Sequence, residues 1–175
     1  MNLIRDAGTT IGTGFLATPF LLPVLVDQGY SDVAYELLLQ SRPPSWLHMI
    51  DSGATTIWEN WEGLDRQGLG SLNHYSKGAV IQFLHEYVAG LRPVDGFPAY
   101  SKFEIKPAPG GGLDFAEARL NSPYGPIRCA WRQDGDTFTL DVTVPPGTEA
   151  EATMPSGRRA HLGPGEHRLQ EHSRG

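Results

Sequence analysis

The sequence predicts a mixed α+β chain in which a helical half precedes a half built of antiparallel strands. Two observations carry this prediction. Up to about residue 92, apolar residues recur every three or four positions, as they do on one face of a helix. Beyond that point, short runs alternate between apolar and polar residues and are separated by Gly and Pro, which is typical of an antiparallel β-sandwich. The boundary belongs between Arg92 and Tyr100, so we expect one domain over residues 1–92 and another over residues 93–175.

Three helices are predicted in the first half. The first extends over residues 20–28, after a Thr-Pro pair that reads as an N-cap and first helical position, and it stops at a glycine. The second extends over residues 33–40, between a Ser-Asp N-cap and a Pro-Pro pair that forbids continuation. The third, about residues 73–89, has the clearest helical spacing and ends before a glycine and a proline.

Five strands are predicted in the second half, with Gly- and Pro-containing turns between them. They cover residues 102–106, 114–120, 125–132, 137–144 and 149–154. The tail after Leu169 is polar, so we expect it to be frayed.

Composition excludes several classes of function. The 175 residues carry a net charge of −6 and no basic stripe, which argues against a nucleic-acid partner. The longest apolar run, residues 15–26, is broken by two prolines, so no membrane span is expected. The single cysteine, Cys129, excludes an intramolecular disulfide and is expected to be a small core residue, and no histidine has metal-site spacing to an Asp, Glu or Cys. The N-terminus lacks a signal-type apolar stretch, which with one cysteine favours a cytoplasmic location.

The most informative segment places Glu59 between Trp58 and Trp61, shortly before an Asn-His-Tyr sequence that contains His74. Indole faces stack on the C–H faces of a sugar ring, while a carboxyl group handles water or the glycosidic oxygen. A sugar-handling site is therefore the functional interpretation. The alternatives are that the tryptophans are core aromatics and that His74 caps a helix or lies in the core.

Two neighbouring carboxylates complete this segment. Glu62 and Asp65 lie just beyond the motif, and we expect both to be ordinary loop groups.

Five segments, in this order, resemble the C-terminal part of bacterial α-L-rhamnosidases of glycoside hydrolase family 78. They are residues 13–19, 53–61, 73–75, 110–113 and 121–125. The resemblance implies the closing helices of an (α/α)6 barrel, incomplete here, followed by a C-terminal antiparallel β-sandwich.

The resemblance also implies an activity, the release of terminal α-L-rhamnose from glycosides with inversion and without metal or organic cofactor. It assigns the general base to Glu59 and substrate binding to Trp58, Trp61 and His74, with a rhamnosylated small molecule or oligosaccharide as the ligand. The general acid of the family lies on an upstream acidic segment that has no counterpart in these 175 residues.

The chain is therefore expected to be a fragment that is inactive alone and needs the missing N-terminal barrel portion. Two alternatives stay open. One is a non-catalytic carbohydrate-binding or structural module, and the other is the C-terminal half of a split enzyme.

Overall fold

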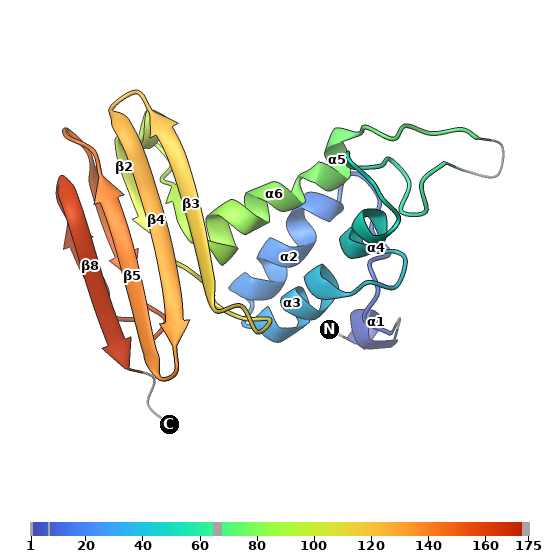
Figure 1. Ribbon diagram of the computed structural model, residues 1–175, viewed down its shortest axis with the longest axis horizontal. Coiled ribbons are helices and arrows are strands. Elements are labelled where there is room, and N and C mark those ends of the chain that lie inside the picture. The colour runs from blue at the N-terminus through green and yellow to red at the C-terminus, as the bar shows by residue number, and fades with distance from the viewer. Residues whose placement is uncertain (1, 7, 65–67, 173–175) are drawn as a thin grey trace. The chain divides into compact units, whose positions relative to one another are not determined.

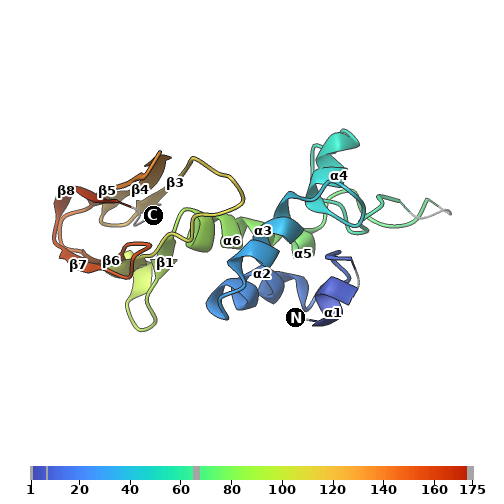
Figure 2. The ribbon, with the colours of Figure 1, turned by 90° about the horizontal axis from the view of Figure 1, so that it is seen from below.

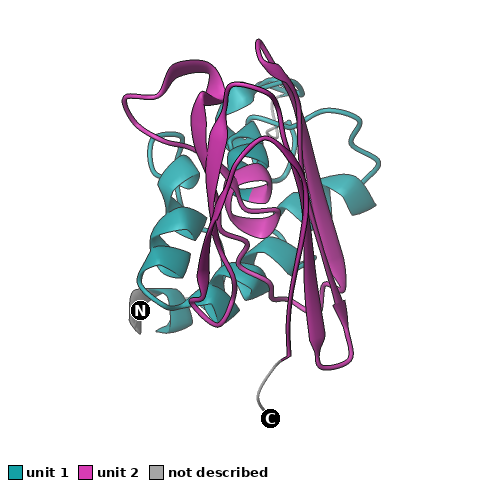
Figure 3. Cartoon of the chain, turned by 90° about the vertical axis from the view of Figure 1, so that its left-hand side faces the viewer, with its two compact units in different colours: residues 1–83 teal, residues 84–175 magenta. Residues whose placement is uncertain are grey.

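The computed structural model describes residues 2–6, 8–64 and 68–172 (Figure 1). The chain divides into two compact units, Met1–Phe83 and Leu84–Gly175 (Figure 3).

The first unit is helical. Its helices are α1 Asn2–Asp6, α2 Thr18–Asp27, α3 Ser31–Leu39, α4 Trp46–Asp51, α5 Tyr75–Gly78 and α6 Val80–Phe83. Helices α2 and α3 follow one another along the chain and pack together (Figure 1). Their buried faces carry Leu22, Leu25, Val33, Ala34, Leu37 and Leu38. Burial of these aliphatic side chains, rather than helix propensity, is what stabilises such short helices.

The first two predicted helices are confirmed, but their predicted caps are wrong. Thr18 is the first residue of α2 and follows Ala17 at the N-cap, while Ser31 is the first residue of α3. The Thr18 hydroxyl instead donates to the carbonyl of Gly14 at 2.9 Å, one turn back. Because this hydroxyl donates to a carbonyl that precedes the helix, it does not act as an N-cap acceptor for the first helical N–H groups.

Helix α4 was not predicted, because six residues are too few to show a helical repeat. It is nevertheless capped in the usual way, since the Ser45 hydroxyl accepts from the backbone N–H of His48 at 3.0 Å. The third predicted helix is present in parts: α5 and α6 are interrupted at Ala79, and a π-helical turn, η1 Leu84–Val88, follows.

The second unit is a sandwich of two four-stranded sheets, which face one another in Figure 2. Its elements are β1 Leu91–Pro93, the 3-10 turn η2 Pro98–Tyr100, β2 Lys102–Ile105, β3 Phe115–Ser122, β4 Gly125–Asp134, β5 Thr137–Val144, β6 Glu149–Thr153, β7 Arg159–Leu162 and β8 Gly165–His172. The sheet orders are β1-β2-β6-β7 and β3-β4-β5-β8. The pair β2–β6 is parallel, whereas every other described pair is antiparallel.

The inner faces of both sheets share one core. Along β5, alternate residues are buried, from Phe138 to Val144, and Leu140 lies opposite Trp131 of β4. Phe103, Ile105, Ala150, Ala152 and Leu162 come from the other sheet. The alternation that predicted the strands is therefore the alternation that fills the core.

All five predicted strands are confirmed, and three more are present. The expectation of a frayed tail is wrong for residues 170–172, which belong to β8 and pair with β5 up to His172 opposite Thr137. Backbone ladder bonds hold this edge strand, so its polar side chains gave no sign of it. Residues 173–175 lie outside the described residues. Within the described ranges, no helix is long and apolar enough to cross a membrane.

Candidate active site

The segment between α4 and α5 doubles back on itself and brings its two ends together. The backbone N–H of Glu59 donates to the carbonyl of Ser71 at 2.8 Å, and the N–H of His74 donates to the carbonyl of Ile57 at 2.8 Å. In its described residues, 52–64 and 68–74, this segment forms neither helix nor strand. The predicted site residues Trp58, Glu59 and His74 are therefore brought side by side by two backbone hydrogen bonds across the loop.

A glycine is required at one point of this loop. Gly70 has φ +117°, and a Cβ there would lie 2.7 Å from Nδ2 of Asn60. The backbone conformation is what favours glycine here, since L side chains rarely adopt it, whereas the Asn60 amide could move aside.

The carboxylate of Glu59 is held at one oxygen. Oε2 accepts from the backbone N–H of Ser71 at 2.7 Å, and the Glu59 side chain is partly exposed. Within the part of the chain that the structure describes, Ser71 is the donor to this carboxylate. A charge-assisted bond of this kind fixes the carboxylate plane and leaves the second oxygen to accept a proton from water.

The two tryptophans differ in their surroundings. Trp58 is partly exposed and lies against Gly63, where an added Cβ would be 3.4 Å from its ring. Trp61 is only 8% exposed and packs edge-on against Trp46, with ring centroids 5.3 Å apart and planes at 83°. Trp58 is thus the more accessible of the two rings, whereas Trp61 packs on α4 through Trp46, and the role of either in substrate binding stays a prediction.

His74 is the N-cap of α5. Its Nδ1 accepts from the backbone N–H of Ser76 at 3.3 Å and lies 2.9 Å from the Ser76 hydroxyl. Its ring stacks between those of Phe15 and Tyr75, with centroids at 4.8 and 4.9 Å. Nδ1 therefore caps the helix, as the capping alternative proposed. Nε2 forms no hydrogen bond among the described residues, so it is the ring nitrogen available to a sugar hydroxyl.

Sequence reasoning missed Lys77, which is 3% exposed and whose ammonium group donates to the main-chain carbonyl of Glu59. The available signal was its spacing, because Lys77 precedes the apolar residues Val80 and Leu84 of the predicted helix by three and seven positions. Burial lowers the pKa of Lys77, against the opposing effect of the Glu59 and Glu62 carboxylates.

The two carboxylates just beyond the motif, Glu62 and Asp65, were expected to be ordinary loop groups. Glu62 is exposed, as expected, and Asp65 lies outside the described residues. Among the described residues, no group of three or more His, Cys, Asp or Glu side chains is arranged to hold a metal ion.

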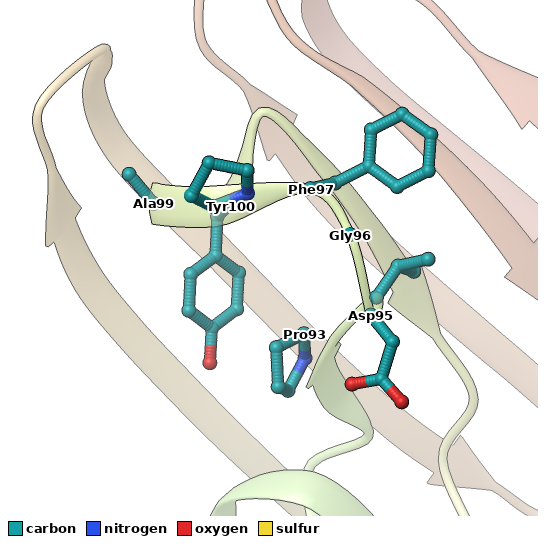
Figure 4. Close-up of a pocket in the computed structure, with 8 residues that line it drawn as sticks. Pro93, Asp95, Gly96, Phe97, Ala99 and Tyr100 are labelled. Carbon is teal, nitrogen blue, oxygen red and sulfur yellow. The ribbon is translucent and has the colours of Figure 1, made fainter.

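Two hollows lie elsewhere. One, of about 390 Å³, is formed in the second unit by residues 93–100 (Figure 4), where the Tyr100 ring and the Asp95 carboxylate extend to one side of the loop and the Phe97 ring to the other. The other, of about 580 Å³, lies over α2 in the first unit and is largely apolar. Neither contains a predicted site residue.

Comparison with known proteins agrees with both halves of this fold. The family model described as the bacterial alpha-L-rhamnosidase 6 hairpin glycosidase domain matches residues 1–88, and the model described as the bacterial alpha-L-rhamnosidase C-terminal domain matches residues 90–168. The chain belongs to the bacterial α-L-rhamnosidase family.

Two curated relatives of this chain are α-L-rhamnosidases. An α-L-rhamnosidase of Streptomyces avermitilis is 42% identical over 160 residues, which cover 88% of this chain and 15% of the relative. One from Formosa agariphila is 40% identical over 168 residues, covering 93% of this chain and 18% of the relative. The chain thus spans less than a fifth of the length of these curated relatives.

Solved structures show the same architecture. The S. avermitilis α-L-rhamnosidase complexed with L-rhamnose superposes with a TM-score of 0.90 at 36% identity, covering 97% of this chain and 19% of that one. The native enzyme of Aspergillus terreus gives a TM-score of 0.91 at 34% identity, covering 97% and 20%. The predicted fold, six-hairpin glycosidase helices followed by a C-terminal β-domain, is confirmed.

Proposed function

We propose that this chain is part of an inverting α-L-rhamnosidase in which Glu59 is the general base. The proposal rests on the hydrogen bond to its carboxylate, in which the backbone N–H of Ser71 donates to Oε2 at 2.7 Å. The same loop is hydrogen-bonded to the backbone of His74. An inverting glycosidase needs a carboxylate that removes a proton from water on one face of the sugar. Fixing one oxygen of Glu59 orients the other toward that water.

The neighbouring residues supply binding in this proposal. Trp58 and Trp61 provide indole surface for a sugar ring, and the free Nε2 of His74 bonds a hydroxyl. The substrate is a terminal α-L-rhamnoside of a small molecule or an oligosaccharide, and the displacement requires no metal or organic cofactor.

The proton donor comes from outside these 175 residues. Inversion requires a second carboxyl group about 6.5–9.5 Å from the base, and we place it on the rest of the six-hairpin barrel. The apolar hollow over α2 supports such a partner, since its lining residues Leu16, just before the helix, and Phe20 and Val24, within it, are 89%, 66% and 54% exposed. In this proposal the remaining barrel helices cover this apolar stripe, which consists of Leu16, Phe20 and Val24.

Hydrolysis of a chromogenic α-L-rhamnoside tests the proposal, with this chain alone and with the chain supplemented by the missing barrel portion. We expect no turnover from the chain alone and turnover from the complemented protein. In the complemented protein, Glu59→Gln should lower kcat by about 10²–10⁴-fold and leave substrate binding largely intact, because the amide cannot accept a proton.

Glu62→Gln is the matched control, since Glu62 is an exposed carboxylate in the same loop, and its variant should retain full turnover. Near-normal turnover of Glu59→Gln would show that the base lies elsewhere. Absence of turnover even after complementation would favour a non-catalytic module.

A further inference from the structure

We infer that Lys77 is a positioning residue for Glu59, whose main chain it holds through a buried ammonium group. The inference rests on the proposed role of Glu59 as the base. Lys77 does not touch the reacting carboxylate, so it acts through the backbone of Glu59 rather than on the substrate.

The burial of Lys77 calls for a specific partner. Lysine is almost never fully buried unless it is paired, because its ammonium group loses water that must be replaced. Here the ammonium donates to the Glu59 carbonyl and lies 4.8 Å from the ring centre of Trp61 and 5.2 Å from that of Phe15. Both rings offer their π-electron density to the cation.

The other end of Lys77 is fixed as well. Its own carbonyl accepts from the indole N–H of Trp46 at 2.9 Å, and Trp46 packs against Trp61. The side chain therefore extends from an anchored helix turn toward the loop, and its length sets where the Glu59 carbonyl lies.

Three hydrogen bonds then hold Glu59. Its N–H is held by the carbonyl of Ser71, its carboxylate by the N–H of Ser71, and its carbonyl by Lys77. The loop has no strand ladder or helix in its described residues to hold the peptide plane that follows Glu59. Without Lys77 that plane is free to rotate, and the carboxylate loses its alignment with Ser71.

The backbone N–H of Ser71 provides a direct reporter of this alignment. Because it donates to Oε2 of Glu59, its proton chemical shift should follow the titration of the carboxylate in the 175-residue chain, and Glu59→Gln should abolish that response. We expect Lys77→Met, which keeps the length and removes the donor, to lose the response as well. Lys77→Arg, which restores a cationic donor, should retain it.

Lys102→Met is the matched control. Lys102 also pairs with a glutamate, Glu149 at 3.0 Å, but lies in the second unit, so its variant should leave the Ser71 response unchanged. A full Ser71 response in Lys77→Met would overturn the inference.

A measurement on the unaltered chain keeps the inference testable if Lys77→Met does not fold. The Lys77 ammonium protons should exchange slowly with water and show a nuclear Overhauser contact to the Trp61 ring. Fast-exchanging ammonium protons without that contact would overturn the inference.

Turnover of the complemented enzyme separates this inference from the proposed function. Lys77→Met should lower kcat about 10–100-fold with little change in KM, as expected for a displaced catalytic group, and Lys77→Arg should recover part of it. If Glu59→Gln inactivates the enzyme but Lys77→Met does not, the positioning role is wrong and the function stands. If Glu59→Gln is without effect while Lys77→Met still abolishes the Ser71 response, the function is wrong and the contact stands.

Discussion

Replacement of Gly90 by alanine should destabilise the β-sandwich unit by more than backbone strain alone. Gly90 has φ +91°, and a Cβ would lie 2.3 Å from the nitrogen of Pro107 and 2.6 Å from the carbonyl carbon of Lys106. These are backbone atoms, which cannot rotate away as a side chain would. The approach is close because the N–H of Lys106 donates to the carbonyl of Gly90 at 2.7 Å.

The magnitude follows from these contacts. The left-handed backbone costs an alanine about 1–2 kcal/mol. Relief of the overlap requires residues 106–108 to move, which breaks the Lys106–Gly90 bond and the bond from Ala108 N–H to the carbonyl of Tyr87, each worth about 1 kcal/mol. We therefore expect Gly90→Ala to lower the free energy of unfolding by about 3–4 kcal/mol.

Gly112→Ala separates strain from overlap. Gly112 has φ +74° but nothing within 4 Å of an added Cβ. Gly112→Ala should therefore lower the free energy of unfolding only by the cost of the left-handed backbone, about 1–2 kcal/mol. Urea unfolding at about 25 °C gives both values when it is followed by the indole N–H resonance of Trp131, which donates to the carbonyl of Val88 at 2.7 Å. Equal destabilisation by the two variants would refute the steric argument.

Three further predictions concern a thiol, an ion pair and the apolar stripe. Burial raises the pKa of Cys129 to about 12, so the folded chain should not react with a disulfide reagent at about pH 8, whereas the urea-unfolded chain should react at once. The hydrogen bonds from Arg168 lower the pKa of Asp141. The ion pair therefore stabilises the folded chain above the ordinary carboxyl pKa, and this stabilisation is lost as the pH falls through the lowered pKa. Asp141→Asn should lower the free energy of unfolding in urea by about 0.5–1 kcal/mol at about pH 7 and by much less at about pH 2. Phe20→Asp should raise the apparent Kd for the missing barrel portion at least about 10-fold in a pull-down titration. Phe115→Asp, at a similarly exposed phenylalanine of the second unit, should leave that Kd unchanged.

Local patterns predicted the elements that bury a regular face. The strand Thr137–Val144 was predicted with its observed bounds, because every second residue from Phe138 onward enters the core. Helix α2 was predicted from its Thr-Pro start and its glycine stop, and α3 from the spacing of Ala34, Leu37 and Leu38. Strand β8, Gly165–His172, was not predicted at all, because an edge strand is held by backbone bonds and leaves no apolar pattern.

The family, the order of helices before strands and the residues of the candidate site could all be inferred from the sequence, because they depend on residue types and spacing along the chain. How these residues contact one another emerged only from the folded chain. The fold brings Ser71 and Lys77 to Glu59 across 12 and 18 positions and buries Trp61 against Trp46, while Trp58 stays partly exposed. Hydrogen bonds between residues so far apart in an irregular loop follow no period, so they arise only when α4 and α5 hold its two ends in place.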